Sequence, residues 1–154
     1  MTIHPSQLPQ AKPELDFLDS SFFQSKQPGQ RLPTPAEVRE LATVKKFRPP
    51  PVTIEHLNLL VKFGPHVTIA EAQCLWLIRK ILGDKVPVPE VYGWRVDGHE
   101  VFIYMQLVRG VTLKERWEHL SVAEKTSVCG QLRRIITSLR QVKQEPFDQF
   151  IGML

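Results

Sequence analysis

Residues 59–110 read LLVKFGPHVTIAEAQCLWLIRKILGDKVPVPEVYGWRVDGHEVFIYMQLVRG, and this stretch decides the fold. Its opening run LLVKF predicts a strand that places Lys62 on the same face as Leu60, with Val61 and Phe63 on the opposite face. A lysine in so apolar a strand needs water or an anion at its charged tip, because an unpaired buried charge is costly. Lys62 is therefore the first candidate for a binding residue.

A helix is predicted over residues 70–82, shortly after this strand. Thr68 is suited to cap it, apolar residues recur through it at helical spacing, and Gly83 ends it. Glu71 then has two interpretations: its carboxylate returns a capping-box hydrogen bond to Thr68, or it pairs with Lys62. The residue pattern alone supports both interpretations equally.

Apolar runs that are separated by turn residues indicate the remaining strands. Asp97-Gly98 is a good turn signal between strands predicted at residues 91–96 and 100–107, and the first two strands are predicted at residues 52–54 and 57–63. The sequence therefore predicts an α+β fold, in which one helix packs on an antiparallel sheet that contains these four strands.

The chain before the sheet divides into two segments. Residues 1–31 are rich in Pro, Gln, Ser and Lys with only short apolar pieces, which predicts a flexible Pro-rich tail. Residues 32–51 predict a helix that Thr34 caps, followed by an extended linker through three consecutive prolines. The alternative for the tail is that its apolar side chains dock on the folded part; these are Phe17, Leu18, Phe22 and Phe23.

Two helices are predicted after the sheet, within residues 111–154. Thr112 caps a short helix, and Ser121 starts a long helix that runs to about residue 142. If nothing covers the apolar stripe of the long helix, we expect self-association or binding of a partner protein through it. The stripe consists of Val128, Leu132, Ile135, Ile136, Leu139 and Val142.

Six segments of the chain together resemble a known family. They are RPPPV (48–52), LLVKFGP (59–65), TIAEAQCLWLIR (68–79), VPVPEVYGW (86–94), VFIYMQLVRGVTLKERW (101–117) and FIGML (150–154). In these segments the chain resembles fungal members of the aminoglycoside phosphotransferase family, which are small-molecule kinases similar to choline kinases. The resemblance begins near residue 32 and covers only the first part of the family's domain.

The resemblance implies a protein-kinase-like small lobe with its hinge in residues 52–110, that is, an antiparallel sheet of about five strands with one packed helix. It also implies the start of a truncated large lobe in residues 111–154. In such a lobe, Glu71 pairs with Lys62 and holds it for the phosphates of a nucleotide. The implied cofactors are ATP and Mg²⁺. Residues 106–110 match the family's linker between the lobes, where backbone groups would meet the adenine ring, and the candidate residues are Met105, Gln106 and Leu107. The alternative is that Met105 and Leu107 are ordinary core or hinge residues.

The sequence lacks the motifs with which the family transfers a phosphoryl group to a small-molecule hydroxyl. It contains no His-x-Asp, no Asn follows Asn58, and Asp148 is the only Asp after the predicted hinge. No Gly lies between Gly29 and Gly64 either, where kinases place a glycine-rich loop over the phosphates. We therefore assign no catalytic residue and no metal ligand, and expect a truncated family member that is inactive alone.

Two other functions remain as alternatives. The first is a non-catalytic module, derived from a kinase lobe, that binds a nucleotide or a partner protein. The second is a complete enzyme with another chemistry, which has little support because five scattered His residues and the isolated Cys74 and Cys129 form no triad or metal spacing. The residues give no indication of the phosphate acceptor.

Composition excludes several further classes. The net charge of +4 is dispersed without a basic stripe, which argues against nucleic-acid binding. No apolar run is long enough to span a membrane, and the N-terminus lacks the pattern of a signal or transit peptide. Both cysteines fall in predicted helices, where reduced thiols are expected. We therefore expect a cytoplasmic protein.

Overall fold

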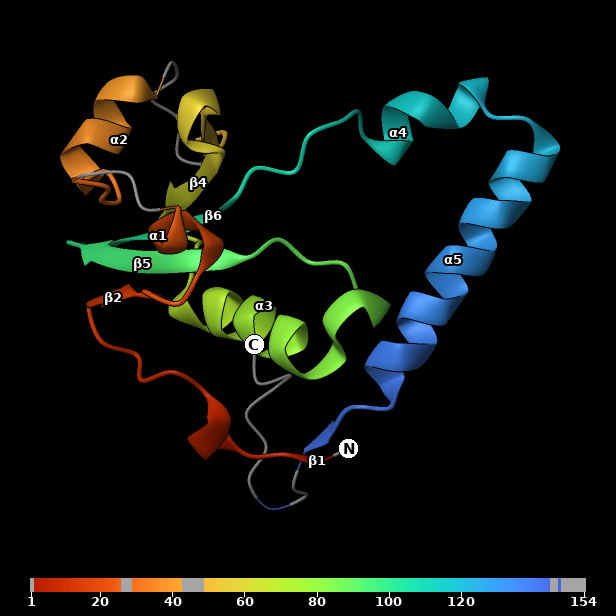
Figure 1. Ribbon diagram of the computed structural model, residues 1–154, viewed down its shortest axis with the longest axis horizontal. Helices are drawn as coiled ribbons and strands as arrows, with labels where there is room; N and C mark the ends of the chain where they lie inside the picture. The colour runs from red at the N-terminus through yellow and green to blue at the C-terminus, as the bar shows by residue number, and fades with distance from the viewer. Residues whose placement is uncertain (1, 26–28, 43–48, 145–146, 148–154) are drawn as a thin grey trace.

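The computed structural model describes residues 2–25, 29–42, 49–144 and 147. It has an α+β fold built on a five-stranded antiparallel sheet with strand order β2-β5-β6-β4-β3 (Figure 1). The predicted class and sheet type are confirmed. The strands of this sheet are β2 (Glu14–Asp16), β3 (Val52–Ile54), β4 (Leu59–Gly64), β5 (Val91–Asp97) and β6 (Glu100–Gln106).

The hairpin of β5 and β6 forms the middle of the sheet, as its sequence predicts. Asp97 faces Glu100 across the turn, where Gly98 adopts a positive φ of 63°. Strand β4 pairs with the other edge of β6, so that Leu59 faces Gln106 and Lys62 faces Ile103. This register places the lysine and the predicted hinge on the same pair of strands.

The break between the first two strands was predicted at Glu55-His56 or at Asn58, and it covers both, so that only the start of the second strand is later than predicted. A 3₁₀ turn, η2 (Glu55–Leu57), follows β3, and Asn58 has a left-handed backbone with φ of 50°. Asn tolerates this conformation better than most residues because its short polar side chain can bond locally. Strand β4 consequently begins at Leu59 rather than at Leu57.

Helix α3 (Ile69–Leu82) covers one face of the sheet (Figure 1). Thr68 caps its start, and Gly83, with φ of 50°, ends it and leads into η3 (Gly83–Lys85). The buried side chains between the helix and the sheet include Val67, Ala72, Val91, Trp94, Ile103 and Met105. This face also carries Leu60, which agrees with the predicted strand parity.

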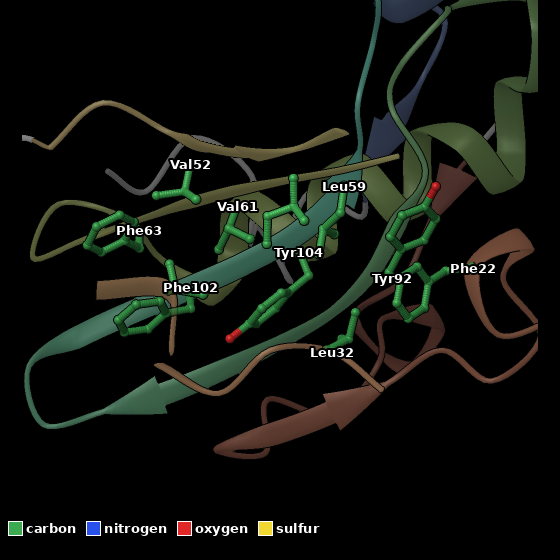
Figure 2. Packing of buried hydrophobic residues seen from close by; sticks show 11 residues of the cluster. Phe22, Leu32, Val52, Leu59, Val61, Phe63, Tyr92, Phe102 and Tyr104 are labelled. Carbon is green, nitrogen blue, oxygen red and sulfur yellow. The ribbon is translucent and has the colours of Figure 1, made fainter. Parts of the chain in front are cut away.

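The opposite face of the sheet holds a second core, which Figure 2 shows from close by. Phe63 and Phe102 stack there from neighbouring strands with ring centroids 5.0 Å apart. The cover comes from α1 (Ser21–Gln24), α2 (Pro35–Leu41) and Leu32 between them. The buried residues of this core are Phe22, Leu32, Val38, Val52, Ile54, Leu59, Val61, Phe63, Tyr92, Phe102 and Tyr104.

The described part of residues 1–31 corrects the prediction of a flexible tail. Glu14–Asp16 is an edge strand that pairs with β5, and Phe22 is buried in the core. The docking alternative holds for Phe22 and for the half-buried Phe17, whereas Leu18 is 65% exposed. Docking is favoured because these aromatic side chains leave water when they meet apolar faces of the sheet.

Helix α2 starts at the predicted capping box. Thr34 accepts a hydrogen bond from the Glu37 N–H, the Glu37 carboxylate bonds back to Thr34, and Val38 is fully buried. Arg39 joins this helix to the β5–β6 hairpin through ion pairs with Asp97 and Glu100. The predicted helix end at residue 43 and most of the linker lie outside the described residues.

The two predicted C-terminal helices are both present. They are α4 (Leu113–Arg116), which continues as η4 (Trp117–His119), and α5 (Val122–Arg140). Figure 1 shows α5 standing apart from the sheet, and none of its residues is buried. After α5, β7 (Lys143–Gln144) pairs in parallel with β1 (Thr2–Ile3), which η1 (Pro5–Gln7) follows. No helix within the described residues is long and apolar enough to cross a membrane.

Candidate functional site

Strand β4 and helix α3 bring Lys62 and Glu71 together. The Lys62 Nζ lies 2.5 Å from the Glu71 Oε1, and the two side chains are 44% and 34% exposed. Alternation along β4 turns Lys62 toward the face that α3 covers, and Glu71 lies in the first turn of that helix. The result is a lysine whose position is fixed by a carboxylate while its tip stays accessible to water.

The structure decides between the two interpretations that the sequence left open for the Glu71 carboxylate, in favour of Lys62. The Glu71 backbone N–H donates to the Thr68 Oγ1 at 3.4 Å, while the Glu71 carboxylate pairs with Lys62. The reciprocal carboxylate bond of a capping box forms at Thr34 but not at Thr68. The predicted pairing of Lys62 with Glu71 is therefore confirmed as a contact.

The predicted hinge residues end strand β6, close to the same site. Met105 is buried in the α3 core. The Gln106 N–H donates to the Glu90 carbonyl at 2.8 Å, and the Leu107 N–H donates to the Asn58 carbonyl at 3.0 Å. Because these two donors already have backbone partners, a planar base beside the hinge would have to bond other backbone groups.

Glu90 is a further residue of this region, and sequence reasoning missed it. Its carboxylate accepts hydrogen bonds from the Ser21 N–H at 3.1 Å and from the Ser21 hydroxyl at 2.5 Å, at the start of α1. Arg79 of α3 lies 3.9 Å from the same carboxylate. Glu90 thus connects α1, α3 and the predicted hinge. Its position in the sequence, after two prolines, did not indicate this role.

A groove with a volume of about 540 Å³ lies beside the hinge. The C-terminal part of α3 and the connection to β5 form one side, and the hinge forms the other. Its lining residues are Arg79, Gly83, Asp84, Pro87, Val88, Pro89, Gln106 and Val108. Lys62 and Glu71 are not among them, so the ion pair and this groove are separate features.

The titratable side chains of the described segments do not suggest a metal site. Within those segments, no group of three or more His, Cys, Asp or Glu residues is arranged to hold an ion. Cys74 and Cys129 are free. Burial raises the pKa of the Cys74 thiol, and the nearby Glu71 charge adds to this, which disfavours a reactive thiolate.

Comparison of the chain with protein-family models, with curated proteins and with solved structures found no match.

Proposed function

We propose that residues 52–110 are a protein-kinase-like small lobe in which Lys62 binds the phosphates of a nucleotide. We further propose that the chain is related to the aminoglycoside phosphotransferases, whose activity is ATP-dependent phosphoryl transfer to a small-molecule hydroxyl. The observation that carries both proposals is the ion pair of Lys62 on a central strand with Glu71 on the packed helix.

The chemistry of the pair supports phosphate binding. A lysine ammonium donates charge-assisted hydrogen bonds to phosphate oxygens, and a fixed lysine loses less conformational entropy when it binds. Glu71 supplies that restraint, and the 44% exposure of Lys62 leaves room for an incoming anion. Phosphoryl-transfer enzymes depend largely on such positioning and charge stabilisation.

The remaining requirements are met only in part. Lys62 fits the phosphates of ATP, but the N–H groups of Gln106 and Leu107 are engaged and do not fit the edge of an adenine. The described residues do not present a carboxylate cluster for Mg²⁺. The proposed contribution of this chain is therefore phosphate binding, and no step of phosphoryl transfer is assigned to its residues.

Calorimetric titration of the chain with ATP tests this proposal. We expect binding by the unsubstituted chain and a loss of about tenfold to a hundredfold in affinity for Lys62→Ala, the effect of removing a charge-assisted hydrogen bond. Lys114→Ala is the matched control, because it removes an exposed lysine from α4 and should leave the affinity unchanged. Absence of ATP binding by the folded chain would refute the proposal.

The exposed stripe of α5 favours a second candidate function, a module that binds through this helix. Leu132, Ile136 and Leu139 are 43%, 46% and 36% exposed, so the stripe is uncovered over much of the helix. Burying it against a second copy of the chain would remove this apolar surface from water. Sedimentation of the chain beside a Leu132→Ser, Ile136→Ser variant tests this: dimers that dissociate in the variant support it, and monomers in both refute it.

A further inference from the structure

The N-terminal part of the chain contacts α3 at Gln73 and Trp76, which follow Glu71 along the same helix. We name residues 9–17 the N-terminal clip. Its last residue, Phe17, stacks on Trp76 of α3, with ring centroids 5.8 Å apart and planes inclined by 21°. The same ring meets the edge of Trp94 in β5, at a centroid distance of 5.6 Å. Phe17 therefore joins the helix to the sheet through two tryptophans.

The clip is fastened to the sheet by backbone hydrogen bonds. The Val96 N–H donates to the Pro13 carbonyl at 2.7 Å, and the Phe17 N–H donates to the Tyr92 carbonyl at 2.9 Å. The Trp94 indole Nε1 also donates to the Lys12 carbonyl, at 2.8 Å. These bonds fix the clip along β5, so the position of Phe17 is set by the sheet.

The clip also holds α3 directly. The Gln73 side-chain amide donates to the Pro9 carbonyl at 2.7 Å. Gln73, Trp76 and Lys80 follow one another at spacings of three and four residues, so they form one row along the helix. Within the helix, the Lys80 Nζ lies 4.5 Å from the centroid of the Trp76 ring that Phe17 stacks on. The row starts two residues after Glu71.

We infer that the N-terminal clip is a positioning device that holds α3 in the orientation in which Glu71 pairs with Lys62. The pair cannot hold the helix by itself, since ion pairs between half-exposed side chains contribute little. Ala72 buries one side of α3 against the sheet, and the clip contacts the helix at Gln73 and Trp76. Displacement of the clip frees the helix at these contacts and lets Glu71 move away from Lys62.

This inference has one part that is independent of the proposed function and one part that rests on it. The restraint of α3 by residues 9–17 is a property of the fold. Its effect on nucleotide affinity rests on the proposal that Lys62 binds phosphate. When α3 is partly open, Glu71 holds Lys62 in place in a smaller fraction of the chains. The apparent affinity for the nucleotide then falls by the same fraction.

Hydrogen–deuterium exchange of the full chain tests the restraint, with Phe17→Ala compared with Leu18→Ala. Leu18 is the matched control because it is the next residue and is 65% exposed. We expect amides 73–82 to exchange roughly tenfold faster in Phe17→Ala, which corresponds to about 1.4 kcal/mol of opening free energy. The amides of β4 and β6 should be unchanged, and Leu18→Ala should behave as the unsubstituted chain.

Two results would overturn the inference. One is equal exchange of α3 in Phe17→Ala and Leu18→Ala. The other is equal acceleration in α3, β4 and β6, because Phe17 would then stabilise the whole fold rather than the helix. Gln73→Ala is a milder second variant that removes only the bond to Pro9, and it should accelerate α3 alone by a smaller factor.

The native thiol of Cys74 gives an independent readout in α3, in a Cys129→Ser background. Its labelling rate should rise in Phe17→Ala, because burial of this thiol depends on the position of the helix. ATP titration of the same variants separates the two proposals. Faster labelling with no ATP binding by any variant refutes the proposed function alone, whereas normal labelling with Lys62-dependent ATP binding refutes the clip alone.

Discussion

Arg95 forms an ion pair with Asp16, with 2.7 Å between the Nη2 of the guanidinium and the Oδ1 of the carboxylate. The arginine side chain is only 12% exposed, and it also pairs with Glu14 and donates to the Leu15 carbonyl. One side chain of β5 thus reaches three consecutive residues of β2. It fastens the edge strand on the face opposite to Phe17.

Replacing Arg95 with Ala should therefore release β2 and destabilise the fold by about 1.5–3 kcal/mol, the range for hydrogen bonds to charged groups, because the fold loses the bonds that the nearly buried arginine makes to partners more exposed than itself. Urea denaturation measures this change. Arg31→Ala is the matched control, since its pair with Glu37 is exposed and its loss should shift the midpoint far less. Equal shifts would show that the Arg95 network has no special role.

Gly93 should not tolerate a side chain. A Cβ at this position would lie 2.4 Å from the Leu15 carbonyl oxygen and 2.9 Å from the Leu32 Cδ1. Gly93→Ala should push β2 away from β5 and reduce the free energy of unfolding by about 1–3 kcal/mol, as overpacking does. The measurement is the thermal midpoint, and an unchanged midpoint would contradict the close approach of β2.

Gly130→Ala should have the opposite effect. Gly130 lies inside α5, and the nearest atom to a new Cβ is 3.9 Å away at the end of the Arg134 side chain. The substitution should stabilise the helix by about 0.5–1 kcal/mol, because glycine loses more backbone entropy than alanine. Circular dichroism at rising temperature would reveal it, and a loss of helical signal would argue against α5 as described.

Tyr104 should make the protein sensitive to alkali. Its hydroxyl is buried and has no hydrogen-bond partner among the described residues, and burial raises its pKa above the usual range. The unfolded chain loses this proton near pH 10, before the folded chain does, so stability should fall as pH rises above about 10. The urea midpoint, measured from pH 8 upward, checks the direction.

Tyr104→Phe is the matching variant, and it should reduce this alkaline loss. At neutral pH it should leave stability unchanged or raise it by about 1 kcal/mol, since it removes an unpaired buried hydroxyl. Tyr92→Phe is the contrast, because Tyr92 lines a pocket together with the polar residues Ser21 and Asn58. A large destabilisation by Tyr104→Phe at neutral pH would show that its hydroxyl has a partner.

Lys62→Met should change the free energy of unfolding by less than about 1 kcal/mol, the usual range for an accessible ion pair. Glu71→Gln should do the same, because the side chains are 44% and 34% exposed. Urea denaturation measures both. A loss of several kcal/mol in either variant would indicate that the pair serves the fold rather than a ligand.

The sequence predicted the elements whose pattern is local. The capping residues Thr34, Thr68, Thr112 and Ser121 marked the starts of four helices, and Asp97-Gly98 marked the central turn. Strand parity also placed Lys62 on the face of α3, which made its pairing with Glu71 predictable.

The fifth strand could not be predicted in this way. Glu14–Asp16 is only three residues long, lies among prolines, and pairs with residues about eighty positions later, so no local periodicity marks it. For a related reason, the sequence could not show that the N–H groups of Gln106 and Leu107 already donate hydrogen bonds within the fold. Their partners are the backbone carbonyls of Glu90 and Asn58, and backbone pairing leaves no side-chain signature.

The pairing of β1 with β7 has a consequence for the order of folding. Thr2 faces Lys143 and Ile3 faces Gln144, so two short strands close a loop of roughly 140 residues. Closing such a loop has a large entropic cost and gains few contacts. The β1–β7 pair should therefore form after the five-stranded sheet during folding, and open before it during unfolding. Opening of the β1–β7 pair would release the C-terminal end of α5, which lies just before β7, while the five-stranded sheet stays intact (Figure 1).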